Sequence, residues 1–276
     1  MKLPHSTRIS RRLLPGCLAF PSLLLVILLA LPAMQLLAVP ASAGTTQGGQ
    51  THALDQSIAK YLQRQFASNN NLKDVQVSVS DRVVTLSGTV PDYRSLLNAN
   101  DMARGVQSVN GVIDHLTVNA PQVEDAKLRN EIAQRLTYSR FGMGQIFNGI
   151  KVAVNNGVVT LSGQVVDYPS RDSAVSIASD TKGVRRVVDH IKVAPLSPFD
   201  NQIRYEAYRA IYKNPNLLRY AMNPAHTIRI LVNNGHVTLW GVVNNKMDKQ
   251  LAYQAVMGLP NVFSVKNDLV VAGGGK

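Results

Sequence analysis

Apolar residues recur along the chain in two alternating patterns, and the whole order repeats three times. Leu54, Ile58 and Leu62 show the three-to-four-residue spacing of an amphipathic helix, and short β-branched runs follow them. A second helical pattern and a last β-branched run complete each copy. The order predicts helix, hairpin, helix and strand. The corresponding first-helix positions in the later copies are Leu128, Ile132 and Leu136, then Ile203, Ala207 and Ile211.

The clearest repeat is an eight-residue strand pattern with a glycine at its sixth position. Residues 83–90 are VVTLSGTV, residues 158–165 are VVTLSGQV and residues 236–243 are HVTLWGVV. An Asp or Asn follows that glycine by 26 residues in every copy. Two anchors that keep their register three times indicate an internally repeated unit. These second anchors are Asp114, Asp189 and Asn267.

The repeated order predicts an α+β protein built from three tandem αββαβ modules behind an N-terminal signal segment. A strand–helix–strand crossover joins parallel strands, so each module should form a mixed three-stranded sheet with two helices on one face. Short proline-marked joints at Pro121 and 195–198 lead us to expect contact between neighbouring modules. The expected boundaries are a linker at 44–52 and modules at 53–119, 124–194 and 200–272.

Turn and helix-start residues refine this picture. The Asn-Asn-Gly sequences at 155–157 and 233–235 favour tight hairpins, because Asn and Gly tolerate positive φ. The first copy has Ser-Asp-Arg at 80–82, so its turn need not have the same type. Carboxylates near the first-helix starts are expected to accept free helical N–H groups. They belong to Asp55, Asp125 and Asp200.

The repeated strand, the later Gly183-Val184 pair and the last strands around Leu116, Ile191 and Leu269 resemble the BON domain. The resemblance covers nearly all of the chain after residue 52. It implies the same helix–strand–strand–helix–strand fold. It also implies a role in the cell envelope, linked to osmotic stress and phospholipid surfaces. The third copy departs most from the pattern, since Trp240 replaces the serine of the other two.

The first 43 residues show the features of a secretory signal peptide. Basic residues precede an apolar run over 17–39, and Ala41-Ser42-Ala43 supplies the small residues of a cleavage site. We expect cleavage after Ala43 and a periplasmic protein. Two alternatives stay open: an uncleaved inner-membrane anchor through 17–39, and export by the twin-arginine route.

Charge and composition limit the classes of partner that the protein could bind. Lys and Arg number 29 against 17 Asp and Glu, and four of the basic residues lie before Gly44, which leaves +8 after it. Export argues against nucleic acid, so we expect an anionic phospholipid surface, or an envelope polymer or protein, as partner. The lone Cys17 excludes an intramolecular disulfide. A scaffold for periplasmic proteins is the alternative, and the sequence leaves the oligomeric state open.

Catalytic patterns are missing from the sequence. There is no H-E-x-x-H, P-loop or G-x-S-x-G pattern, and three Glu residues leave few acid–base pairs. His115 and His190 follow Asp114 and Asp189, but adjacent strand residues point to opposite faces. We therefore predict no catalytic residue, metal or cofactor, and disfavour a wall-modifying hydrolase. Gly88, Gly163 and Gly241 are expected to be structural.

The first helix of the third copy is the candidate binding site. Its apolar residues lie on one side of the helix, which is enough to pack against a core. Aromatic and basic residues lie on the other side. Tyrosine suits a membrane interface, and Arg and Lys suit lipid phosphates. Alternatively, the tyrosines pack on the second module or on residues 214–225. The candidate membrane- or partner-binding residues are Arg204, Tyr205, Tyr208, Arg209, Tyr212 and Lys213.

Overall fold

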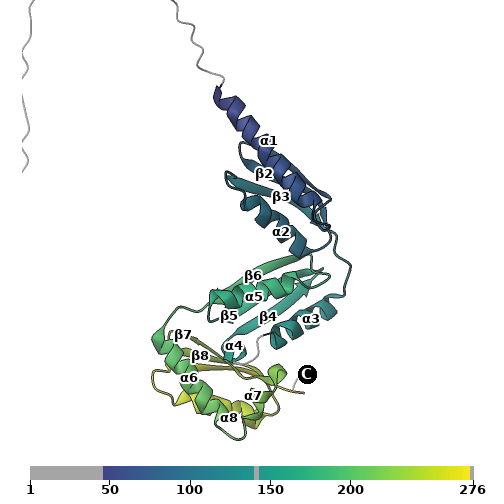
Figure 1. Ribbon diagram of the computed structural model, residues 1–276. Coiled ribbons are helices and arrows are strands. Elements are labelled where there is room, and N and C mark those ends of the chain that lie inside the picture. The colour runs from purple at the N-terminus through teal and green to yellow at the C-terminus, as the bar shows by residue number, and fades with distance from the viewer. Residues whose placement is uncertain (1–45, 140–142, 274–276) are drawn as a thin grey trace, which may run out of the picture. The chain divides into compact units, whose positions relative to one another are not determined.

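The computed structural model describes residues 46–139 and 143–273 (Figure 1). Three separate three-stranded sheets follow one another along the chain, which confirms the predicted α+β architecture of three modules. The expected signal peptide, its cleavage site and the alternative anchor at 17–39 lie outside the described residues.

The first module shows the topology that all three share. Its central strand pairs antiparallel with the strand before it and parallel with the strand after the second helix. The first helix begins at Thr46, so most of the segment expected to be a linker at 44–52 is helical instead. The elements are α1 (Thr46–Ala67), β1 (Val75–Ser80), β2 (Val83–Val90), α2 (Tyr93–Arg104) and β3 (Gly111–Val118).

The second and third modules keep this order and add short helical insertions before their hairpins. The second consists of α3 (Asp125–Tyr138), α4 (Met143–Ile146), β4 (Gly149–Asn155), β5 (Val158–Val165), α5 (Tyr168–Ser179) and β6 (Arg186–Val193). The third consists of α6 (Pro198–Tyr212), α7 (Arg219–Met222), the 3₁₀ helix η1 (Pro224–His226), β7 (Arg229–Asn233), β8 (His236–Val243), α8 (Lys246–Met257) and β9 (Ser264–Val271).

Each module has its own hydrophobic core between its sheet and its two helices. Val84 and Leu86 of β2 are fully buried, while the residue between them is half-exposed, because successive strand residues point to opposite faces. Apolar residues of both α1 and α2 join the same cluster. The core of the third module differs, because Ile146 and Phe147 of the second module belong to it. The second and third modules are therefore packed together.

A glycine on each central strand lets the backbone of the first strand approach closely. Gly163 has a φ of +116°, and a Cβ there would lie 2.1 Å from the carbonyl oxygen of Gly149. Any side chain would meet backbone that cannot rotate away, and φ itself is one that only glycine adopts without strain. The same holds for Gly88 (φ +113°) and Gly241 (φ +143°).

All three hairpins share one turn geometry. Asn156 and Gly157 have φ values of 50° and 75°, and positive φ at both central residues is the type I′ signature. Asp81 and Arg82 adopt the same geometry without a glycine, at 50° and 62°. The first turn is therefore of the same type as the others.

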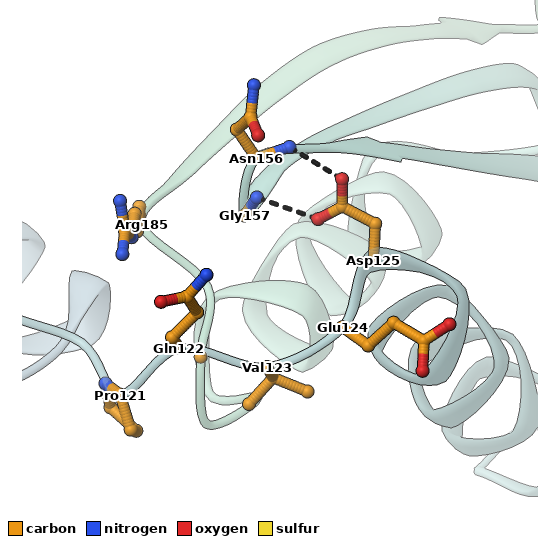
Figure 2. Close-up of a pocket in the computed structure, with 9 residues that line it drawn as sticks. Pro121, Gln122, Val123, Glu124, Asp125, Asn156, Gly157 and Arg185 are labelled. Atoms are coloured by element: carbon orange, nitrogen blue, oxygen red, sulfur yellow. Dashed lines mark hydrogen bonds between the residues drawn. The ribbon is translucent and has the colours of Figure 1, made fainter.

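The expected role of the three helix-start carboxylates is corrected. They accept N–H groups, but from the hairpin turn of their own module and not from the helix. Asp125 accepts from the backbone N of Asn156 at 2.7 Å and of Gly157 at 3.0 Å (Figure 2). Ser197, not Asp200, caps α6. The equivalent pairs are Asp55 with Asp81 and Arg82, and Asp200 with Asn234 and Gly235.

Candidate functional site

The candidate site lies on α6, whose position is fixed at both its start and its apolar face. The Ser197 hydroxyl accepts a hydrogen bond from the backbone N of Asp200 at 3.1 Å, which caps the helix. Ile203, Ala207 and Ile211 are fully buried against the sheet of the third module. The six candidate residues are therefore divided among the remaining sides of the helix.

Two of the six candidates, Arg204 and Tyr212, are buried, so the expectation that they form an exposed face is wrong. Arg204 is 4% exposed, and its Nη2 donates to the carbonyl oxygen of Val232 at 2.8 Å. The Tyr212 hydroxyl donates to the carbonyl oxygen of Ile228 at 2.7 Å. Burial raises the pKa of Tyr212. Both side chains supply donors to carbonyls in or beside β7, because β7 is an edge strand with one side unpaired.

Two further candidates pack on the second module, as the alternative interpretation had it. The Phe147 ring lies edge-on to the rings of Tyr205 and Tyr208, with centroid distances of 5.7 and 6.5 Å. Tyr208 is half-buried, and its ring also packs on the Tyr212 ring, with a distance of 5.2 Å between the ring centroids. Such aromatic pairs contribute about 0.5–1.5 kcal/mol beyond the area they bury. Much of the aromatic face is therefore an intramolecular contact.

Three of the six candidates, Tyr205, Arg209 and the C-terminal cap residue Lys213, remain exposed along α6 and are called here the α6 stripe. Residues four apart lie on one side of a helix, so these three side chains follow one another along its surface. Tyr205 is 48% exposed, and Arg209 and Lys213 are exposed. The guanidinium of Arg209 has a long hydrogen bond of 3.4 Å to the carbonyl oxygen of Tyr205. The stripe thus presents two cations and a phenol to solvent.

The His–Asp neighbours lie as the strand geometry predicts. Asp189 accepts from Nε of Arg171 at 2.7 Å, on the side of α5. Asp114 likewise accepts from Nδ2 of Asn100 on α2 at 2.7 Å. Each aspartate thus turns toward the helices, and its histidine neighbour faces the other side of the sheet.

The described residues contain neither a cluster of metal ligands nor a helix that could cross a membrane. Between residues 46 and 273, leaving out 140–142, no three His, Cys, Asp or Glu side chains are grouped to hold a metal. Within the same part of the chain, no helix has the length and apolar character to cross a bilayer.

Sequence reasoning missed a second location, where the third module meets the second. Gln164 donates from Nε2 to the carbonyl oxygen of Val232 at 3.1 Å, and Gln145 donates to that of Pro224 at 2.6 Å. Beside these bonds, the guanidinium of Arg229 stacks on the ring of Trp240. The substitution of Trp240 for serine was the one available signal, and nothing in the sequence paired it with Arg229.

Comparison with known proteins identifies one family along most of the chain. A family model described as BON domain matches residues 54–120, 124–195 and 200–273. Osmotically-inducible protein Y of Escherichia coli is 30% identical over 146 residues, which are 50% of this chain and 72% of that protein. Outer membrane lipoprotein DolP of Haemophilus influenzae is 30% identical over 131 residues, 44% of this chain and 67% of that protein.

Solved structures add little. The C-terminal domain of CdsD, a structural protein of the type III secretion system of Chlamydia trachomatis, is 14% identical. The match covers 79% of this chain and 96% of that one, with a TM-score of 0.23. At that score the likeness carries no argument about this chain.

Proposed function

The chain belongs to the BON domain family, and on this basis we propose that it is an exported, non-catalytic envelope protein that binds anionic phospholipid surfaces. We propose that this binding serves protection under osmotic or envelope stress. The names of the two relatives, one osmotically inducible and one an outer membrane lipoprotein, support an envelope role. Family membership supports the prediction that the chain is not an enzyme.

The observation that carries the lipid proposal is the α6 stripe. A phenol ring with a polar tip sits favourably at the depth of lipid headgroups, and flanking cations attract their phosphates. Each Lys or Arg near an anionic membrane contributes about 1 kcal/mol. Arg209 and Lys213 make no ion pair among the described residues, so both charges remain available. The net charge of the chain after Gly44, +8, has the matching sign.

Sedimentation with vesicles tests this proposal. We expect the protein to sediment with phosphatidylglycerol–phosphatidylcholine vesicles and to stay in solution with phosphatidylcholine alone. The double variant Arg209→Gln/Lys213→Gln should bind the anionic vesicles about tenfold more weakly or worse, because two charges are lost. Glutamine keeps much of each aliphatic stem, so the fold of α6 should be retained.

The matched control changes the same charges in the first module. Lys60 and Arg64 are exposed on α1 at the same four-residue spacing, and Lys60→Gln/Arg64→Gln should leave vesicle binding nearly unchanged. An equal loss of vesicle binding in both double variants would show that the attraction is unspecific. It would refute the proposal that the α6 stripe is the binding site. Binding to neither vesicle, with an envelope protein captured instead, would favour the scaffold alternative.

We also propose that the protein reaches the periplasm after cleavage behind Ala43. The basic start, the apolar run at 17–39 and the small residues before Gly44 support this. Intact mass spectrometry of the protein isolated from the cell envelope should give a chain that begins at Gly44. A mass that retains residues 17–39 would instead favour the inner-membrane anchor.

A further inference from the structure

An arginine and a tryptophan distinguish the sheet of the third module from the other two. Arg229 begins β7 and lies opposite Trp240 on β8, and its guanidinium carbon is 4.9 Å from the ring centroid. At the corresponding positions the first module pairs Gln76 with Ser87, and the second pairs Lys151 with Ser162. The stacked cation therefore belongs to the third module and is no requirement of the fold.

Among the residues that the structure describes, the N–H groups of the Arg229 guanidinium lack a partner. Stacking on an aromatic ring uses the face of the guanidinium and leaves its donors, which lie in the plane, free to bind an acceptor. Within residues 46–139 and 143–273, no carboxylate pairs with Arg229 and no hydrogen bond engages its guanidinium. Burial lowers the pKa of Arg229, with Tyr212 opposing the shift. A desolvated cation without a counter-ion is costly, so an anion that reached it would be held strongly.

A cavity of about 210 Å³ lies beside this pair, between the second and third modules. Its walls are partly polar and partly aliphatic, with the cation at one side. The volume is below the roughly 300–1,000 Å³ of pockets that enclose whole drug-sized ligands, so it suits one end of a molecule. The cavity is lined by residues of both modules, among them Leu136, Thr137, Gln145 and Ile150 of the second and Arg229 and Trp240 of the third.

We propose that this cavity binds a small oxyanion, a carboxylate or phosphate group carried on a short apolar stem. The in-plane donors of Arg229 hold the oxyanion, since the guanidinium fork matches both groups. Trp240 fixes the guanidinium from its face, and Leu136 and Ile150 contact the stem. The ligand thus requires the second and third modules together, which gives their packing a role in binding.

Fluorescence titration tests the proposal, because Trp240 is the one tryptophan in the sequence and reports from the cavity. Butyl phosphate, butyrate, butanol and chloride are added to the purified exported protein at constant ionic strength. We expect a saturable change with butyl phosphate or butyrate, at a dissociation constant of about 1 mM or below. Butanol and chloride should give none. The stronger of the two oxyanions identifies the group that the site prefers.

Variants assign the binding to Arg229. Arg229→Gln should weaken binding at least about tenfold by isothermal titration calorimetry, which does not depend on the altered tryptophan environment. Arg186 also begins a strand and is exposed, so Arg186→Gln should leave the affinity unchanged. Unchanged affinity in Arg229→Gln, or no saturable response of the unmodified protein to either oxyanion, would overturn the proposal.

Chemical protection keeps the test independent of the folding of any variant. Phenylglyoxal modifies arginine side chains, and butyl phosphate or butyrate should slow its reaction at Arg229 but not at Arg186, as read by peptide mass spectrometry. Equal modification with and without the oxyanions would contradict the site. The Arg209→Gln/Lys213→Gln variant should still bind the oxyanion, so failure of this proposal and failure of vesicle binding can be told apart.

Discussion

Gly163→Ala should destabilise the second module by about 3 kcal/mol or more in urea unfolding. The new Cβ would lie 2.1 Å from the carbonyl oxygen of Gly149, and an L-residue would be strained at a φ of +116°. Relief requires β4 to separate from β5, which breaks their antiparallel pairing. Far-ultraviolet circular dichroism along a urea series gives the unfolding midpoint.

Gly111→Ala provides the matched control. Gly111 begins β3, and a Cβ there would have no heavy atom within 4 Å. We expect its unfolding free energy to change by no more than about 0.5 kcal/mol, and in the stabilising direction, because alanine restricts the unfolded chain. If Gly163→Ala unfolded at the same urea concentration as this control, the inference that the close approach of β4 and β5 requires a glycine would be wrong.

Asp200→Ala should destabilise the third module by about 3 kcal/mol. Asp200 is 1% exposed, and its carboxylate accepts from the backbone N of Asn234 at 2.9 Å and of Gly235 at 2.8 Å. Hydrogen bonds to a charged group contribute about 1.5–3 kcal/mol each, and their loss leaves two amides near the protein interior without acceptors. Amide hydrogen exchange at Asn234 and Gly235 should accelerate, together with a lower unfolding midpoint.

Asp172→Ala serves as the control for the loss of an aspartate. Asp172 is exposed on α5, and its replacement should change stability by less than about 0.5 kcal/mol. Unaltered exchange at Asn234 and Gly235 in Asp200→Ala would show that the turn holds its geometry without the carboxylate.

The sequence predicts the repeated architecture well because the repeat itself carries the information. Alternating strand patterns set which residues are buried, as Leu86, Leu161 and Leu239 show in their separate sheets. The partners of Asp125 and Asp200 were not predictable in the same way. A helix-start aspartate suits a cap, and the hairpin turns that take these carboxylates lie about 30 residues further along the chain.

The candidate site was predicted only in part, for a reason that concerns α6 itself. The spacing of apolar residues identifies one buried face of a helix and leaves all other positions as exposed. That interpretation is correct only for a helix that is packed on one side. Here β7 takes the donors of Arg204 and Tyr212, and Phe147 from the preceding module covers Tyr208. The short segment that carries Phe147 has no counterpart in the first module, so the repeat gave no signal for it.

Hydrogen–deuterium exchange of the protein with and without phosphatidylglycerol vesicles tests whether the α6 stripe is the surface that meets the membrane. Vesicles should protect the backbone amides of α6 around Tyr205, Arg209 and Lys213, while α1 of the first module exchanges as before. Protection confined to the first module, or none under conditions where the protein sediments with the vesicles, would contradict that role of the α6 stripe.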